Sequence, residues 1–163
     1  MNVSLKKFGP HDWQEYRSIR LEALAAHPHY FCPSRDETQF TEVDWQQRLN
    51  NVNACTFGLF ADGELIGLTG VVRDHTEFEK AHLVSSYIKP KYRKMGLSRL
   101  FYEARIQWAQ EQKDIKYLVV DHNAENVPSM KAHQKFGFEF SNSYDEISLS
   151  GQTKKIVCYK LKI

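Results

Sequence analysis

The sequence predicts one domain of mixed α/β (α+β) class, and three patterns lead to that prediction. Two apolar runs, 55–60 and 64–72, are joined through Asp62-Gly63, a dipeptide typical of tight hairpins. A third apolar run, 81–88, leads through a basic turn into a segment of helical periodicity, 97–108. Because antiparallel strands precede a strand–turn–helix unit, the chain fits a mixed fold better than a pure sandwich.

Composition and charge are those of an ordinary globular protein. The 163 residues suit a single domain, 1–163, with 42% hydrophobic and 26% charged residues. A formal net charge of +2 argues against a surface built for nucleic acid or a membrane. Cys32, Cys55 and Cys158 are widely spaced, which argues against a disulfide framework or a metal site. No apolar run suits a signal peptide or a membrane span, so we expect a cytoplasmic protein.

The N-terminal third predicts one short strand followed by helices. Residues 3–5 form the strand, and Asp12 stands where the N-cap of a helix is expected. Helical periodicity follows over 13–24, and a second, shorter helix is predicted over 44–49. The segment between them, 27–41, contains two prolines and several aromatic residues. It predicts either a loop or a broken helix.

Strands and helices also alternate in the rest of the chain. Inside the predicted hairpin, Gly67 and Gly70 indicate a bulge or a close approach by another segment. The continuous apolar run 117–120 predicts a strand covered on both faces, parallel to the strand before it. A short helix is expected over 127–136, and the alternation over 157–163 predicts the last strand.

The turn between the strand 81–88 and the helix 97–108 has the chemistry of an anion-binding site. Basic residues crowd it: Lys89, Lys91, Arg93, Lys94 and Arg99. The first N–H groups of a helix have no partner within the helix, and the helix dipole favours negative charge there. Gly96 lets the backbone approach a ligand closely. The alternative is a solvated surface turn, because basic turns with a glycine are common.

Two motifs resemble those of the GNAT family of N-acetyltransferases. The run 93–98 is Arg-Lys-Met-Gly-Leu-Ser. It resembles the family's pyrophosphate-binding motif, which begins with Gln or Arg and has a glycine three positions later. Ser98 departs from that motif, which usually ends in Gly or Ala. Asn126, Ser129 and Ala132, with the ending 135–138, resemble the second cofactor-side motif. The two motifs stand in the family's order.

This resemblance implies a fold and a cosubstrate. The expected fold is a central, mostly antiparallel sheet with a splayed parallel strand pair, flanked by helices, and the expected cosubstrate is acetyl-CoA. Tyr87 and Ile88 would pair with the pantetheine arm, and one of their N–H groups could polarise the thioester carbonyl. Asn126 and Ser129 would lie beside the cosubstrate. The pyrophosphate would be held by backbone N–H groups of Arg93, Lys94, Met95, Gly96, Leu97 and Ser98.

The resemblance also implies direct attack of a primary amine on the thioester, with histidines at both usual catalytic positions. Counting back from Arg93, His82 stands where many members have a glutamate base. Counting on from Asn126, His133 stands where many have a tyrosine acid. Because histidine titrates near neutrality, neutral His82 could accept the amine proton and a cationic His133 could protonate the thiolate. The alternatives are that both are polar residues without a role, or that Tyr87 or Tyr92 is the acid.

The identity of the acceptor amine stays open. We expect a small molecule, because the sequence predicts no large charged docking surface. The early helices would form one acceptor wall, whose acidic residues could attract a cationic amine or simply form a solvated face: Asp36, Glu37, Glu42 and Asp44. A homodimer through the C-terminal strands is a further expectation. The departures at positions 82 and 133 also leave open a non-catalytic acyl-CoA-binding sensor or partner-binding module.

Overall fold

The computed structural model describes residues 1–28, 35–148 and 150–163, and its strands form one mixed sheet. The strand order is β1-β2-β3-β4-β5-β7-β6, and among these strands only β4 and β5 pair in parallel. This confirms the predicted mixed, mostly antiparallel fold. The strands are β1 Val3–Lys7, β2 Ala54–Ala61, β3 Glu64–Arg73, β4 Lys80–Ile88, β5 Tyr117–Asn123, β6 Glu139–Ile147 and β7 Thr153–Lys162.

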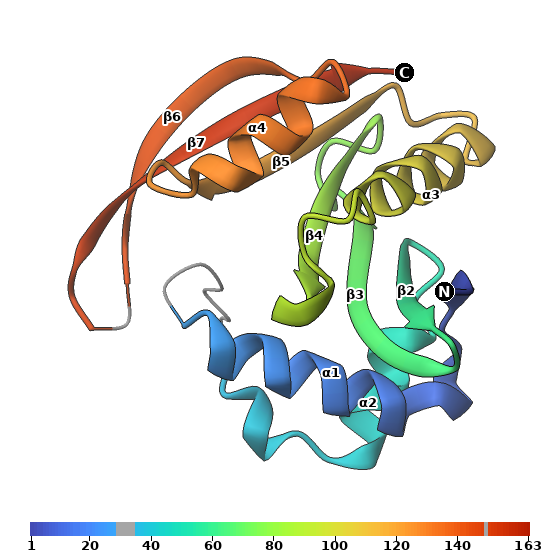
Figure 1. The fold of residues 1–163 in the computed structure, drawn as a ribbon. Helices are drawn as coiled ribbons and strands as arrows, with labels where there is room; N and C mark the ends of the chain where they lie inside the picture. Colours follow the sequence, from blue (N-terminus) through green and yellow to red (C-terminus); the bar gives the residue numbers. More distant parts are fainter. Residues whose placement is uncertain (29–34, 149) are drawn as a thin grey trace.

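Helices cover both faces of the sheet (Figure 1). One face is covered by α1 (Trp13–Ala26) and α2 (Glu42–Leu49), and the other by α3 (Ser98–Glu111) and α4 (Val127–Lys135). Single 3-10 turns are η1 Pro10–Asp12, η2 Glu37–Gln39 and η3 Pro90–Tyr92. Among the helices in the described part of the chain, none has both the length and the apolar character needed to cross a bilayer.

Each face of the sheet carries its own apolar core. On the side of α1, Ile19 and Trp45 are fully or almost fully buried. On the side of α3, Val71, Trp108 and Leu118 form the centre of a second core. The apolar residues at helical spacing in α1 and α3 therefore lie on one face of each helix, and that face packs against the sheet, as predicted.

Element boundaries differ from the predicted ones by a few residues. The second helix begins at Glu42 rather than at residue 44, because the Thr41 hydroxyl accepts a hydrogen bond from the N–H of Asp44 and caps it. The segment 27–41 contains a 3-10 turn at Glu37–Gln39, so its described part is a loop with one short helical turn. Residues 29–34 of this segment, Cys32 among them, lie outside the described residues, so the prediction of a loop or broken helix has no test there.

The predicted hairpin and its irregularity are both present. Asp62 and Gly63 have positive φ angles of 48° and 84°, as the tight turn between β2 and β3 requires. The register of β3 against β4 shifts between Leu68 and Gly70, and Ser85 of β4 has a φ of 59°. A bulge of this kind changes the face at which the following side chains point. Gly67 lies at a close approach, where a Cβ atom would come 2.6 Å from the backbone oxygen of Tyr87.

We expect the substitution Gly67→Ala to lower the free energy of unfolding by about 1–3 kcal/mol, because a methyl group there collides with backbone that cannot move aside cheaply. Urea denaturation measures the loss. The matched control is Gly70→Ala, whose new methyl group would meet the side chain of Val84 at 3.2 Å. That side chain can shift, so the control should lose less. An equal loss in both variants would contradict this account.

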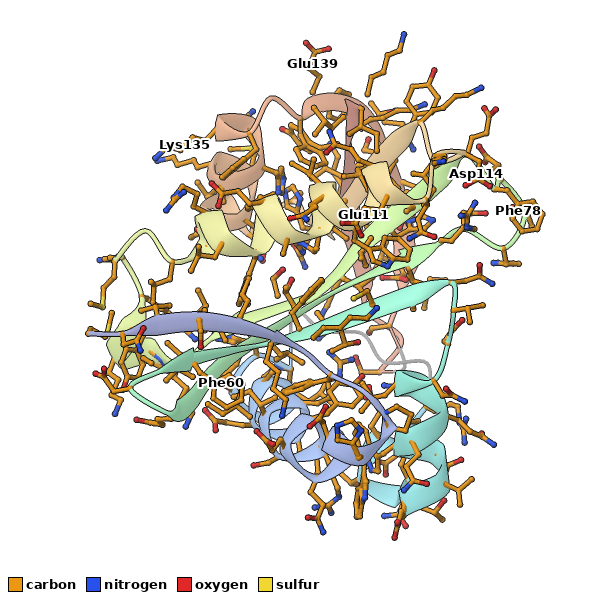
Figure 2. The ribbon with its side chains drawn as sticks, turned by 90° about the vertical axis from the view of Figure 1, so that its right-hand side faces the viewer. Phe60, Phe78, Glu111, Asp114, Lys135 and Glu139 are labelled. Atoms are coloured by element: carbon orange, nitrogen blue, oxygen red, sulfur yellow. The ribbon has the colours of Figure 1, made fainter. Side chains whose placement is uncertain are left out.

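Hydrogen bonds and an ion pair hold one end of the β4–β5 pair together. Figure 2 shows Phe78 and Asp114 at the same end of the molecule. Arg73 of β3 joins them, because its guanidinium donates to both carboxylate oxygens of Asp114, at 2.8 and 2.9 Å, and to the carbonyl oxygen of Phe78. The carbonyl oxygen of Glu79 also accepts from the N–H of Lys116 at 2.7 Å. The two strands are therefore fixed together where they begin.

The C-terminal hairpin leaves β6 as an edge strand with exposed apolar side chains. Phe140, Tyr144 and Ile147 are 60%, 43% and 74% exposed. β6 pairs with β7 along its length, and its other edge has no strand beside it among the described residues. The homodimer expected through these strands stays a prediction.

Candidate functional site

The strands β4 and β5 separate after three residue pairs, and a cleft opens where they part. The last pair is His82 with Val119, although β4 continues to Ile88 and β5 to Asn123. The cleft has a volume of about 1220 Å³ and is lined from β4, β5, α3, α4 and the turn before α3. The predicted splayed pair is therefore present, and Figure 1 shows β4 and β5 parting. Residues of both sequence motifs line the cleft.

The turn before α3 has a backbone suited to an anion. Lys94 and Gly96 have positive φ angles of 61° and 75°, a pattern that turns successive N–H groups toward one side. The helix begins at Ser98, and no side chain caps its first N–H groups. Within the turn, Arg93, Lys94, Gly96, Leu97 and Ser98 line the cleft. Met95 is half exposed and is absent from that lining.

The side chain of Arg93 is fixed over the end of β4. Its Nε donates to the carbonyl oxygen of Ile88 at 2.8 Å, and its Nη2 lies 2.8 Å from Nε2 of His27. Burial, together with the charge of Arg93, lowers the pKa of His27, so this imidazole can accept the hydrogen bond in its neutral form. Arg93 thus links the end of α1 to β4 through its side chain.

Neither tyrosine proposed as a substitute acid aims its hydroxyl at the cleft as a free donor. The Tyr87 hydroxyl donates to Oε1 of Glu22 at 2.9 Å, and burial with this contact raises its pKa to about 12. The Tyr92 hydroxyl donates to Oε2 of Glu64 at 2.9 Å. Tyr87 and Ile88 both line the cleft, as expected for residues beside the pantetheine arm.

His82 lines the cleft and forms a dyad with Asp74, a residue that the sequence did not single out. Its Nε2 lies 2.7 Å from Oδ2 of Asp74. The other carboxylate oxygen accepts from the N–H and hydroxyl of Thr76 and from the N–H of Glu77, at 2.8, 2.8 and 2.9 Å. These contacts, first of all the one with His82, hold the pKa of Asp74 far below its usual range. Asp74 is therefore a fixed carboxylate, and when Nε2–H donates to it, Nδ1 of His82 is the basic nitrogen.

His133 is buried, and its surroundings do not suit the cationic acid that the sequence suggested. The side chain is fully buried and is absent from the lining of the cleft. Burial, followed by the nearby His122 and Arg105, lowers its pKa to about 3, so the ring is neutral near pH 7. Its Nδ1 lies 3.4 Å from the Tyr102 hydroxyl, and its ring packs 4.6 Å from that of His122. Burial and the lowered pKa therefore disfavour an imidazolium here, and the catalytic role of His133 stays a prediction.

The start of α4 forms the opposite wall of the cleft. Asn126 caps the helix, since its side-chain oxygen accepts from the N–H of Ser129 at 3.2 Å. Asn126, Ser129 and Ala132 all line the cleft, so the second sequence motif and the anion-binding turn face the same space. His122 of β5 lines it too, and neither of its ring nitrogens has a partner among the described residues.

The acidic residues of the early helices lie in different surroundings, and one of them is buried. Asp36 and Asp44 accept hydrogen bonds at the starts of η2 and α2. Glu37 is 2% exposed and pairs with Arg20 and with Arg48. The expected attraction of a cationic amine by this set is therefore corrected for Glu37, whose charge two guanidinium groups already neutralise. Arg20 in turn donates to the Ser85 hydroxyl at 3.1 Å, which links this cluster to the bulge of β4.

Two buried arginines were missed by sequence reasoning, although the sequence contained a signal for them. Arg20 lies on the buried stripe of α1 between Ile19 and Ala23, and Arg105 lies on that of α3 between Phe101 and Trp108. A charged residue on the apolar face of a helix indicates a buried partner or a ligand. Both arginines line the cleft.

Comparison with known proteins gives one family match and many similar structures. A sequence model of the acetyltransferase (GNAT) family matches residues 10–138. No curated protein matches the sequence. Among solved structures, a GNAT-family acetyltransferase from Streptococcus pneumoniae has a TM-score of 0.82 and 20% identity, covering 99% of this chain and 100% of its own.

Two further structures show the same likeness of fold. A putative acetyltransferase from Acinetobacter baylyi has a TM-score of 0.80 and 21% identity, covering 99% of this chain and 93% of its own. A putative acetyltransferase from Salmonella typhimurium, solved with its cofactor acetyl-CoA, has a TM-score of 0.78 and 16% identity. It covers 99% of this chain and 94% of its own. At these identities the likeness concerns the fold.

Proposed function

The chain belongs to the GNAT family of acetyltransferases, and from this premise we propose that it transfers the acetyl group of acetyl-CoA to a primary amine of a small molecule. The observation that carries the proposal is the cleft between β4 and β5, on which the anion-binding turn and the start of α4 converge. The S. typhimurium relative, which shares this fold, was solved with acetyl-CoA.

The residues around the cleft fit the parts of acetyl-CoA. The N–H groups of the turn from Arg93 to Ser98 would hold the pyrophosphate, because the positive φ angles and the uncapped helix start supply donors and a favourable dipole. Beyond the last β4–β5 pair, the backbone near Tyr87 and Ile88 would pair with the pantetheine arm. Asn126 and Ser129 would lie beside that arm, on the other wall of the cleft.

The reaction needs a base, and His82 with Asp74 supplies one. The amine must lose a proton, attack the thioester carbon to form a C–N bond, and release the C–S electron pair to sulfur. His82 would take the amine proton, and Asp74, 2.7 Å away, would stabilise the imidazolium and fix its orientation. In this scheme Asp74 is a positioning residue, because it acts on the amine only through His82.

A second function has one specific observation in its favour. Because burial keeps His133 neutral, the acid that many family members use is missing at its usual position. A protein that binds an acyl-CoA without catalysis, as a sensor or a partner-binding module, would tolerate that loss. Release of free thiol from acetyl-CoA in a screen of small amines separates the two functions. Tight binding without thiol release for any amine would favour the sensor.

Calorimetric titration with acetyl-CoA tests the binding half of the proposal. We expect saturable binding to the wild-type protein, and a loss of at least about tenfold in affinity for Gly96→Glu. The added side chain would fill the turn and bring a negative charge to the anion site. The matched control is Gly63→Glu in the β2–β3 turn. Gly63 has a φ of 84° against 75° at Gly96, and a Cβ atom at either position meets nothing within 4 Å.

The Gly63→Glu control separates a specific effect at the anion-binding turn from a general effect of strain or charge. Both variants carry the same charge change and similar backbone strain, so only the place of the substitution differs. Equal loss of affinity in Gly63→Glu and Gly96→Glu would mean that strain or net charge causes the effect. No binding to folded wild-type protein would remove the proposed function.

A further inference from the structure

Arg105 of α3 is a buried cation that has no ionic partner among the described residues. It is 2% exposed and lines the cleft. Its Nε donates to the carbonyl oxygen of Phe101 at 3.1 Å and its Nη1 to the Ser86 hydroxyl at 2.8 Å. Among the residues that the structure describes, no carboxylate forms an ion pair with it. Its polar contacts are therefore all with neutral groups.

The side chain keeps its charge in spite of burial. Burial lowers the pKa of Arg105 to about 10, with the nearby Tyr102 opposing the shift, so the guanidinium remains cationic at neutral pH. It lies over the Tyr102 ring at 4.9 Å, and the Ser86 hydroxyl that it contacts lies 3.0 Å from that of Thr69. These partners orient the guanidinium but do not neutralise it.

Burying a charge without a counter-charge lowers the stability of the fold. Packing of α3 against the sheet does not require a charged side chain at position 105. An apolar side chain of similar volume at a buried charged site is often neutral or stabilising. Arg20, another buried arginine that lines the cleft, shows the usual solution, since Glu37 pairs with it at 2.9 Å. The contrast between the two indicates that the counter-charge of Arg105 arrives from the cleft.

The position of Arg105 in the cleft indicates which negatively charged part of the ligand would lie beside it. Its partner Ser86 follows the bulge in β4, beyond the point where β4 leaves β5, and the turn that would hold the pyrophosphate lies at the N-terminal end of α3. Tyr102 lies between Arg105 and His133, the residue at the position where many relatives have the acid that acts on sulfur. Its hydroxyl lies 3.4 Å from Nδ1 of His133, and the Arg105 guanidinium lies 4.9 Å from the centre of its ring. The cation therefore stands on the side of the cleft where the thioester sulfur is expected.

We propose that Arg105 stabilises the negative charge that develops on the sulfur of acetyl-CoA as the thioester breaks, so that the coenzyme leaves as a thiolate. The inference rests on the proposed function. The amine nitrogen forms the new C–N bond, its proton passes to His82, and the C–S electron pair stays on sulfur beside the guanidinium. No proton donor at the position of His133 is needed in this step, which reconciles catalysis with a neutral, buried histidine there.

Binding of the free coenzyme tests this directly. Free CoA carries a thiol and desulfo-CoA does not, so the ratio of their affinities isolates the sulfur. In the wild-type protein we expect this ratio to rise at least about tenfold between about pH 6.5 and pH 9, because Arg105 favours the thiolate of bound CoA, and one pKa unit corresponds to a tenfold change. Arg105→Met should abolish the rise and leave desulfo-CoA binding within about twofold of the wild type.

Other titratable groups around Arg105 do not mimic this signal. Tyr102, on the same helix, has its pKa raised by burial. His133 on α4 and His122 on β5 have lowered pKa values, again through burial. Tyr102 and His133 therefore keep one charge state over the range tested. Arg105→Lys keeps a positive charge without the planar fork and should retain part of the rise.

The outcomes separate this inference from the proposed function. If CoA binds at neither pH, both the proposed function and this inference are wrong. If CoA binds but the ratio to desulfo-CoA is unaffected by pH, or rises equally in Arg105→Met, the role of Arg105 at sulfur is wrong and the acetyltransferase proposal stands. If Arg105→Met weakens CoA and desulfo-CoA alike, the arginine serves another part of the ligand, which also overturns the inference.

Discussion

Replacement of His82 by alanine is expected to lower kcat by about 10²–10⁴-fold, the usual contribution of a positioned general base, while the Kd for acetyl-CoA stays within about twofold. The side chain lies at the last β4–β5 pair, on the wall of the cleft, so its removal should spare the anion-binding turn. Steady-state kinetics with an amine found in the acceptor screen measures kcat, and calorimetric titration measures the Kd for acetyl-CoA.

Two companion variants show whether the effect belongs to the dyad. Asp74→Asn keeps the shape of the side chain but removes the charge that orients and stabilises the imidazolium, so kcat should fall. His75→Ala changes an exposed histidine in the same loop and should leave kcat unchanged. Unchanged turnover in His82→Ala would indicate that water alone removes the amine proton. Equal losses in His75→Ala and His82→Ala would indicate a general effect of the loop.

The fold was largely predictable because it depends on patterns that are local in sequence. The Asp62-Gly63 turn, the strand periodicity and the apolar stripes of α1 and α3 each follow from constraints within a few residues. The anion-binding turn is local too, since Lys94 and Gly96 adopt the positive φ angles that such a turn needs. The order of these elements then restricts the topology to a few arrangements.

The chemistry of the site was less predictable, because it depends on contacts between distant segments. Asp74 meets His82 only because the loop between β3 and β4 folds back over the start of β4. The neutral state of His133 comes from packing against β5 and α3, and its position in the motif gives no sign of it. Glu37, in turn, sits in a charged stretch of sequence that resembles a solvated surface, yet it is buried.

The burial of Glu37 leads to a prediction about stability. Glu37→Ala is expected to lower the free energy of unfolding by about 3–5 kcal/mol, because it removes the carboxylate that the buried Arg20 shares with the partly exposed Arg48. Glu37→Gln should lose somewhat less, since an amide still accepts one hydrogen bond. Urea denaturation at pH 7 measures both losses. The matched control is Glu42→Gln, an exposed position on α2, which should change stability by less than about 0.5 kcal/mol.

The cluster of Glu37, Arg20 and Arg48 also makes the free energy of unfolding depend on pH in the acidic range. Arg20 and Arg48 lower the pKa of Glu37 below its ordinary value of 4.5, against the opposing and larger single effect of burial. A carboxyl group with a lowered pKa in the folded state contributes its full stability above the ordinary value. That contribution is lost as the pH falls through the folded value. Wild-type protein should therefore lose stability below about pH 4.5 more steeply than Glu37→Gln. Parallel curves for the two proteins would contradict the assignment.

The cluster also connects stability to the site. Arg20 donates to both Glu37 and the Ser85 hydroxyl, so the carboxylate holds the guanidinium against the bulge of β4. The bulge precedes Ser86 and Tyr87, which line the cleft. Glu37→Gln protein that remains folded should consequently bind acetyl-CoA more weakly than Glu42→Gln protein, because the strand that would pair with the pantetheine arm is less fixed. Equal affinities would restrict Glu37 to a purely structural role on the side of α1 and α2.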